Sequence, residues 1–215
     1  MPDPDAVAAL RHAPVADQIR SRRLIAVLRR IEPRERLLDL VASLAADGVR
    51  VFEITFDAPD AGDDLVAVRE RLVASGDAEA VVGAGTVLMV DRLEDAVRCG
   101  AAFVVGPTLD VALVDRAVEL GVPVIPGAYS PTEIALAWGA GATFVKVFPA
   151  SSVGPSHVRE LRGPLPHVEL IATGGVDAEN AGAFLAAGCV AVGVGGALVN
   201  GSHEERRAIV GAAGG

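Results

Sequence analysis

The stretch GAGATFVKVFPA, residues 139–150, contains the pattern that decides the fold. A helix-like segment ends at Gly141, and an apolar run of strand type follows directly. A glycine just past a helix adopts the left-handed conformation without a steric clash, and a strand after it makes the α-to-β step of an α/β fold. The same step recurs along the chain at Gly48, Gly100, Gly121 and Gly188.

This recurrence predicts eight strands, each followed by a helix. The predicted strands are 24–29, 51–56, 80–84, 102–106, 123–126, 143–148, 168–172 and 190–194. Eight such units indicate an α/β fold, a (β/α)8 TIM barrel, as a single domain over residues 1–215. The alternative is an open doubly wound sheet, which favours a glycine-rich turn after its first strand. The segment LIAVLRRIEP, residues 24–33, has no such turn.

Helix starts are also visible in the sequence. Residues 1–23 precede the first predicted strand, and we expect them to form an extra N-terminal helix. Ser130–Glu133 is a capping box, in which the side chains of the first and fourth residues bond each other's backbone N–H. Related patterns at Asp91–Glu94 and Ser202–Glu205 predict two further helix starts.

The composition limits the classes of function. Hydrophobic residues make up 51% of the 215 residues and aromatic residues only 4%, so we expect a core of aliphatic side chains. The net charge of −9, without basic clusters, argues against nucleic-acid binding. No apolar run approaches the roughly 20 residues that span a bilayer, and the N-terminus lacks the apolar segment of a signal peptide. We therefore expect a cytoplasmic protein without membrane association.

A metal centre is not expected either. The two cysteines, Cys99 and Cys189, and the four scattered histidines lack the spacing of metal ligands. The sequence thus predicts chemistry by side chains alone, with no metal and no cofactor.

The lysine within the quoted stretch, Lys146, is the only lysine of the chain. Because side chains alternate along a strand, Lys146 shares a face with Phe144 and Phe148, and Glu53 shares a face with Val51 on the second predicted strand. Burying either charge alone costs several kcal/mol, roughly, or forces neutralisation. We therefore expect Lys146 and Glu53 to face the barrel interior and each other.

Two interpretations of this pair are possible. It is either a structural buried ion pair or a reactive site in which Lys146 is an amine nucleophile. An apolar site lowers the pKa of a lysine, whereas a nearby carboxylate raises it. Arginine stays protonated and cannot serve as a nucleophile. A single lysine, in a chain that otherwise uses arginine, favours the nucleophile.

Glycine-rich turns follow the last two predicted strands. They contain Gly174 and Gly175 after the seventh strand, and Gly195 and Gly196 after the eighth. In TIM barrels a phosphate often binds at these two loops, at the N-terminus of a short helix. The sequence therefore predicts a phosphate site here, and the alternative is a pair of ordinary tight turns.

Five further residues complete the predicted substrate contacts. Thr86 and Thr173 are hydroxyls at strand ends, although each alone is more typical of a turn. Arg29 ends the first strand and could bind an anion or form a salt bridge at the rim. Pro107, directly after the fourth strand, and Phe148, at the end of the sixth, are the remaining candidates.

The chain resembles the 2-keto-3-deoxy-6-phosphogluconate (KDPG) aldolase family, which includes 4-hydroxy-2-oxoglutarate (KHG) and 2-keto-3-deoxy-6-phosphogalactonate aldolases. The resemblance covers roughly residues 22–200. It rests on IAVLR (25–29), GVRVFEIT (48–55), VGAGTV (82–87), IPG (125–127), FVKVFPA (144–150), VGP (153–155), TGGV (173–176) and VGVGGALV (192–199).

The resemblance implies a class I aldolase on a (β/α)8 barrel, assembled as a homotrimer. It implies that Lys146 forms the Schiff base, that Glu53 is the general acid/base and that Thr86 binds the pyruvate portion. Thr173 corresponds to a position that influences stereochemical preference. Arg29 and the glycines of the last two loops correspond to the phosphate end.

One position departs from part of the family. Some members have an arginine four residues after the glutamate, where it binds the pyruvate carboxylate, and here that position is Asp57. Other members also lack the arginine and have a similar PDA segment. The carboxylate ligand is therefore open, with Arg29, Thr86 and backbone amides as candidates.

The expected reaction is cleavage of a phosphorylated keto acid, KDPG, to pyruvate and glyceraldehyde 3-phosphate. Alternatives within the family are cleavage of 4-hydroxy-2-oxoglutarate or of the galactonate analogue, which differs at C4. Thr173 favours the gluconate substrate, because some galactonate-specific relatives have an aliphatic residue there. Alternatives of other classes are a non-covalent sugar-phosphate isomerase or epimerase and a non-catalytic phosphate-ligand binder.

Overall fold

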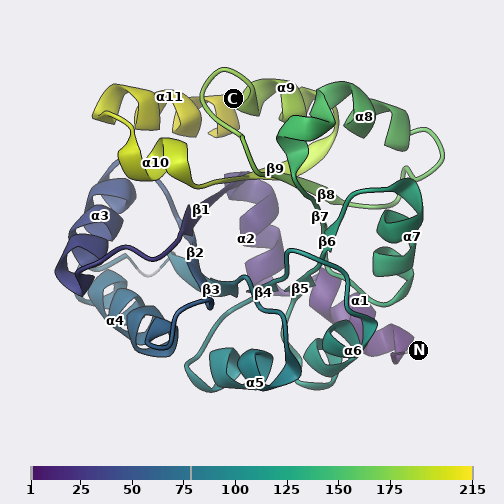
Figure 1. Cartoon of the computed structure of the whole chain (residues 1–215), viewed down its shortest axis with the longest axis horizontal. Coiled ribbons are helices and arrows are strands. Elements are labelled where there is room, and N and C mark those ends of the chain that lie inside the picture. Colours follow the sequence, from purple (N-terminus) through teal and green to yellow (C-terminus); the bar gives the residue numbers. More distant parts are fainter. Residues whose placement is uncertain (1, 78, 215) are drawn as a thin grey trace.

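The structure, a computed structural model, describes residues 2–77 and 79–214. Its strands form one parallel sheet in the order β5-β4-β3-β2-β1-β9-β8-β7-β6, which encircles the centre of the molecule (Figure 1). The strands are β1 Leu24–Leu28, β2 Val51–Thr55, β3 Val81–Gly85, β4 Val104–Val105, β5 Val124–Ile125, β6 Gly127–Ala128, β7 Val145–Val147, β8 Leu170–Thr173 and β9 Cys189–Val194.

The fifth predicted strand, 123–126, corresponds to β5, and β6 continues the chain beyond Pro126, which has no N–H to donate. Val124 of β5 pairs with Val104 of β4, and Gly127 of β6 pairs with Lys146 of β7. Together β5 and β6 therefore join the two edges of the sheet, and the predicted (β/α)8 barrel is confirmed.

Helices cover the outside of the barrel (Figure 1). They are α3 Arg34–Ala46, α4 Ala61–Ala74, α5 Val90–Arg98, α6 Val111–Glu119, α7 Pro131–Gly139, the 3-10 helix η1 Ala150–Ser152, α8 Gly154–Leu161, α9 Ala181–Ala186, α10 Gly196–Asn200 and α11 His203–Gly214. Each turns aliphatic side chains toward the strands, as Val41 and Leu44 of α3 do, and both are fully buried. Burial of one such side chain contributes about 1.5–3 kcal/mol.

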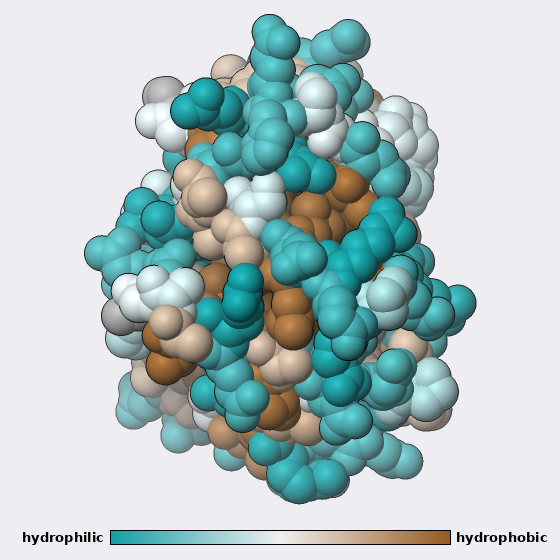
Figure 2. Space-filling model, turned by 90° about the vertical axis from the view of Figure 1, so that its left-hand side faces the viewer, coloured by the Kyte–Doolittle hydropathy of each residue, from teal (hydrophilic) through white to brown (hydrophobic). Residues whose placement is uncertain are grey.

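The outward faces of these helices are polar. Figure 2 shows the side on which α3 and α4 lie, and its surface is mostly hydrophilic with hydrophobic side chains gathered along the middle. In the described ranges, none of the helices has the length and hydropathy needed to cross a membrane.

The helix-start predictions had mixed outcomes. At α7, Ser130 and Glu133 form the predicted capping box, with Ser130 N–H donating to Glu133 Oε2 at 2.7 Å. Ser202 and Glu205 bond reciprocally in the same way before α11. At Asp91–Glu94 a helix does start, since α5 begins at Val90, but its N-cap Met89 makes no side-chain bond and the capping-box contacts are absent.

The N-terminal extension contains two helices, α1 Pro4–Arg11 and α2 Pro14–Arg22, rather than the one expected. Pro14 separates them, since it lacks an N–H and disfavours helical backbone at the residue before it. Ala16 and Ile19 of α2 are fully buried in one apolar cluster with inward-facing strand residues. These strand residues are Ile25, Val51, Phe103, Val105, Ile125, Phe144, Ile171 and Ala191. Helix α2 thus closes the N-terminal end of the barrel and leaves the other end for a site.

Candidate active site

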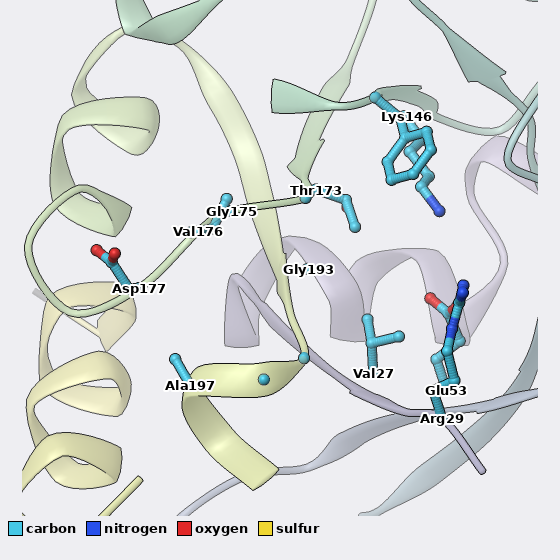
Figure 3. A pocket seen from close by; sticks show the side chains of 14 residues that line it. Val27, Arg29, Glu53, Lys146, Thr173, Gly175, Val176, Asp177, Gly193 and Ala197 are labelled. Atoms are coloured by element: carbon cyan, nitrogen blue, oxygen red, sulfur yellow. The ribbon is translucent and has the colours of Figure 1, made fainter. Parts of the chain in front are cut away.

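A pocket of about 440 Å³ opens at the C-terminal end of the barrel strands (Figure 3). Its walls come from β1, β2, β7, β8 and β9 and from the loops that follow them. The lining residues are Val27, Arg29, Glu53, Lys146, Phe148, Thr173, Gly174, Gly175, Val176, Asp177, Gly193, Gly195, Gly196 and Ala197. In TIM-barrel enzymes the active site lies at this end, because the βα loops converge there.

Lys146 projects into the pocket from the middle of β7. On one side its backbone N–H donates to Pro126 O at 2.9 Å. On the other side Lys146 pairs with Ile171 of β8. The residue is only 5% exposed. Its Nζ lies 4.6 Å from the centroid of the Phe148 ring, so a neighbouring aromatic face takes part in holding the amine.

Glu53 projects from the middle of β2 toward the same space and is 3% exposed. Its carboxyl group extends over Gly85 of β3, where an added Cβ would overlap it. The glycine is therefore needed to make room for the carboxyl. In Figure 3 the side chains of Lys146 and Glu53 point toward one another across the pocket.

The two groups perturb each other through space. In the part of the chain that the structure describes, no direct ion pair joins Lys146 to Glu53. Burial raises the pKa of the Glu53 carboxyl, and the positive charges of Lys146 and Arg29 oppose that rise. Burial lowers the pKa of the Lys146 amine, Glu53 opposes that change and Arg29 adds to it. Burial thus favours the neutral amine of Lys146 and the protonated carboxyl of Glu53. These forms suit nucleophilic and acid–base chemistry.

Arg29 and Thr86 meet at the edge of the pocket. Arg29 follows β1, and its Nη2 donates to Thr86 Oγ1 at 3.1 Å. Thr86 has left-handed backbone with φ of 55°, which is uncommon for a threonine and turns the chain sharply after β3. Thr86 is not among the residues that line the pocket, but it contacts Arg29, which is one of them.

Pro107 is not among the lining residues. Its carbonyl lies against Gly127 of β6, and an added Cβ there would overlap it. Its predicted contact with substrate remains a prediction.

The predicted phosphate loops form the opposite end of the pocket. Thr173 ends β8, and Gly174 and Gly175 follow with φ of 93° and 73°, backbone that strongly favours glycine. Gly195 and Gly196 lie at the start of α10, where the first N–H groups of a helix have no partner within it. Both glycine pairs thus line the same wall.

Sequence reasoning missed five lining residues: Val27, Val176, Asp177, Gly193 and Ala197. Face alternation along β1 could have found Val27, since it shares a face with Arg29. No local sequence pattern marks Gly193 as a lining residue of the pocket. Its role depends on its neighbour in the sheet, because an added Cβ would overlap Thr173 Oγ1.

Asp57 is engaged at the rim rather than in the pocket wall. Its Oδ2 lies 3.2 Å from Arg30 Nε, and Arg30 Nη2 donates to its backbone carbonyl at 2.8 Å. Arg29 is thus the basic side chain that the pocket wall contributes besides Lys146. In residues 2–77 and 79–214, no group of three or more His, Cys, Asp or Glu side chains is arranged to hold a metal ion.

Comparison with known proteins adds to this geometry. The protein-family model for KDPG and KHG aldolase matches residues 15–210. The chain is 36% identical over 185 residues to 2-dehydro-3-deoxy-6-phosphogalactonate aldolase of Escherichia coli (strain K12). The aligned region covers 86% of this chain and 88% of that protein. It is 34% identical over 157 residues to 2-dehydro-3-deoxy-phosphogluconate aldolase of Treponema pallidum (strain Nichols). That aligned region covers 73% of this chain and 72% of that protein. These names agree on aldol chemistry and differ in the substrate.

The fold also resembles a solved structure in which the chemistry was trapped. KDPG aldolase from Legionella pneumophila, with pyruvate captured as a covalent carbinolamine, superposes with a TM-score of 0.75 at 27% identity. The similarity covers 92% of this chain and 95% of that one. A carbinolamine is the first adduct of an amine with a ketone, so that relative uses an amine nucleophile.

Proposed function

Because the chain belongs to the KDPG and KHG aldolase family and is a carbon–carbon lyase, we propose that it cleaves 2-keto-3-deoxy-6-phosphogluconate through a Schiff base on Lys146. The products are pyruvate and glyceraldehyde 3-phosphate. The observation that carries the proposal is a single buried lysine facing a buried glutamate in a pocket whose far wall is made of glycine loops.

Lys146 supplies the covalent step. Its neutral amine attacks the C2 ketone to give a carbinolamine, which loses water to form an iminium. When the C3–C4 bond breaks, the electron pair moves into the iminium and leaves an enamine; after C3 is protonated, water hydrolyses the iminium and releases pyruvate and the free amine. Burial lowers the pKa of Lys146, so the neutral, attacking form is more populated than in a free lysine.

Glu53 moves the protons. As a carboxylate it accepts the C4 hydroxyl proton while the aldehyde is released, and as a carboxylic acid it returns a proton to C3 of the enamine. It also assists loss of water from the carbinolamine. Burial raises the pKa of Glu53, which makes the protonated, proton-donating form easier to reach than in a free carboxyl group.

The phosphate binds the glycine loops at the far end of the pocket. Backbone N–H groups of these loops bind phosphate oxygens, and this binding orients a part of the substrate that does not react. Arg29 lies beside Glu53 in the pocket wall (Figure 3) and can pair with either the carboxylate or the phosphate. We assign Thr86 to the pyruvate portion through its contact with Arg29.

The C4 epimer, 2-keto-3-deoxy-6-phosphogalactonate, is the second candidate, because a relative with that name is 36% identical. Thr173, which lines the pocket, favours the gluconate on the family resemblance, since some galactonate-specific relatives have an aliphatic residue at this position. Cleavage rates of the two epimers and of unphosphorylated 4-hydroxy-2-oxoglutarate decide among the three substrates. The proposal includes a homotrimer, which rests on the family resemblance alone, and a cytoplasmic location, which rests on the sequence composition.

The first test is intact-mass spectrometry after borohydride reduction, with and without pyruvate. We expect a pyruvate-dependent mass increase, and peptide mapping should locate it on Lys146, the only lysine of the chain. No adduct in folded protein would contradict the Schiff base and point to a non-covalent isomerase or a phosphate-ligand binder. Few other sites of modification need checking, because the N-terminal amine is the only other aliphatic primary amine of this sequence.

A further inference from the structure

The loop between β8 and α9 forms part of the phosphate wall, and its peptide groups are held from outside the pocket. The N–H of Ser151 donates to Gly174 O at 2.9 Å. The side-chain amide of Asn180, Nδ2, donates to Gly175 O at 2.9 Å. Within the described residues, Asn180 is not one of the side chains that line the pocket.

The amide of Asn180 bridges the two arms of this loop. While its Nδ2 holds Gly175, its Oδ1 accepts the N–H of Asp177 at 3.1 Å. Asp177 returns the contact, since its Oδ1 accepts the N–H of Asn180 at 3.1 Å and that of Glu179 at 3.0 Å. Both functional atoms of the Asn180 amide are therefore engaged with the loop that precedes α9.

The direction of the Gly175–Val176 peptide follows from the Asn180 contact. In a planar trans peptide the carbonyl and the next N–H point in opposite directions. With Gly175 O bound to Asn180, the N–H of Val176 points away from Asn180, toward the side on which Gly175 and Val176 line the pocket. Across residues 2–77 and 79–214, neither Gly175 N–H nor Val176 N–H has a hydrogen-bond partner.

Such a peptide needs an external restraint. Gly174 and Gly175 are adjacent, both have positive φ, and glycine adopts other conformations at little cost. Without the Asn180 contact, the Gly175–Val176 peptide can rotate and present its carbonyl oxygen to the pocket. An oxygen repels an anion that an N–H would bind.

We propose that Asn180 is a positioning residue for the phosphate end of the substrate, an inference that rests on the proposed aldolase function. It acts through the Gly175–Val176 peptide and does not touch the substrate. Its effect is therefore confined to ligands that carry a phosphate, and the chemistry at Lys146 proceeds independently of it.

The test compares a phosphorylated with an unphosphorylated substrate in Asn180→Ala. Losing one hydrogen bond corresponds to roughly a tenfold change, so we expect KM for the phosphorylated keto acid to rise about tenfold with kcat nearly unchanged. KM for 4-hydroxy-2-oxoglutarate and the rate of pyruvate adduct formation should stay at their wild-type values. Asn200→Ala is the matched control, since Asn200 is exposed at the end of α10 and, within the described residues, makes no hydrogen bond to this loop.

Asn180→Asp is the second variant and covers the case in which Asn180→Ala does not fold. It keeps the size and the acceptor for Asp177 N–H, but it places an oxygen against Gly175 O. We expect it to raise KM for the phosphorylated substrate at least as much as Asn180→Ala. Equal changes in KM for both substrates, or no change for either in both variants, would overturn the proposal.

Direct binding of inorganic phosphate separates this inference from the aldolase function. Calorimetric titration of wild type and Asn180→Ala with phosphate requires no turnover, and we expect a weaker affinity in the variant by about the same tenfold factor. If wild type forms no pyruvate adduct but the difference in phosphate affinity persists, the aldolase function fails and Asn180 keeps its role. If the adduct forms and the two phosphate affinities are equal, the role of Asn180 fails alone.

Discussion

A partly buried charged pair at the N-terminal end of the barrel is in direct contact, whereas Lys146 and Glu53 at the C-terminal end stay apart. At the N-terminal end, Arg20 of α2 contacts Glu169 through Nε–Oε1 at 2.8 Å and Nη2–Oε2 at 2.6 Å. At the C-terminal end, Lys146 and Glu53 share a pocket without a direct ion pair in the described chain. Each cation lies over a phenylalanine ring, Arg20 5.0 Å from the Phe144 centroid and Lys146 4.6 Å from that of Phe148.

The difference explains which end is reactive. Hydrogen bonding to Glu169 raises the pKa of Arg20, so this cation is fixed in its charged form. Burial lowers the pKa of Lys146, so this cation loses its proton more readily than a free lysine does. A fully paired charge stabilises the fold, and a buried charge without a direct partner is available for chemistry.

The largest expected effect comes from removing the amine at the C-terminal end. Lys146→Ala and Lys146→Arg should each lower kcat/KM by about 10³-fold or more, because neither side chain can form an iminium. Steady-state cleavage assays measure the loss, and an unchanged circular dichroism spectrum establishes that the barrel is folded. Lys146→Arg is the sharper variant, since it keeps the positive charge. Activity near wild type in either variant would contradict the Schiff base.

The next effect comes from the carboxyl partner. Glu53→Gln keeps the shape of the side chain but cannot exchange a proton, so turnover should fall by about 10²-fold or more. Pyruvate binding, measured as the concentration that half-saturates adduct formation, should change far less. Turnover equal to wild type would remove Glu53 as the acid/base.

A smaller effect is expected at the N-terminal end. Arg20→Ala removes charged hydrogen bonds to Glu169 and Asp17, so the free energy of unfolding should fall by about 2 kcal/mol. Urea denaturation measures this change, with Arg207→Ala in exposed α11 as the control. The kcat/KM value should stay within about threefold of wild type because the pair is remote from the pocket. A large activity loss with unchanged stability would reverse the assignment of the two ends.

The smallest effect is a shift in the pKa of Lys146, which a ¹³C-lysine label reports as one NMR signal because the chain has one lysine. Glu53→Gln removes the negative charge that favours the ammonium form, so the pKa should fall further. Arg29→Gln removes a positive charge that disfavours it, so the pKa should rise. Shifts in the same direction for both variants would contradict this account of the electrostatics.

Much of this arrangement could be predicted from local patterns. The glycine-to-strand steps predicted the barrel, and alternation along single strands placed Lys146 and Glu53 on inward faces. The predicted capping box at Ser130 is present, since it involves residues only three positions apart. At Asp91 the predicted helix start lies within one residue of the observed start at Val90, but Asp91 falls inside the first turn and does not cap it.

Partners far apart in the sequence could not be predicted in this way. The contact between Arg29 and Thr86, the engagement of Asp57 by Arg30 and the fit of Thr173 over Gly193 join residues on different elements. Their side-chain geometry depends on strand register and loop conformation, which periodicity does not encode.

The sequence by itself determined the eight barrel units, the single lysine opposite a glutamate and the glycine loops, because hydrophobic periodicity and glycine conformation are local properties. The tertiary structure alone decided that two helices precede the barrel, that α2 closes one end and that β6 follows the fifth strand beyond Pro126. It also decided that Lys146 and Glu53 share one pocket without a direct bond. The distance between two side chains is fixed only when the ring of strands closes around them.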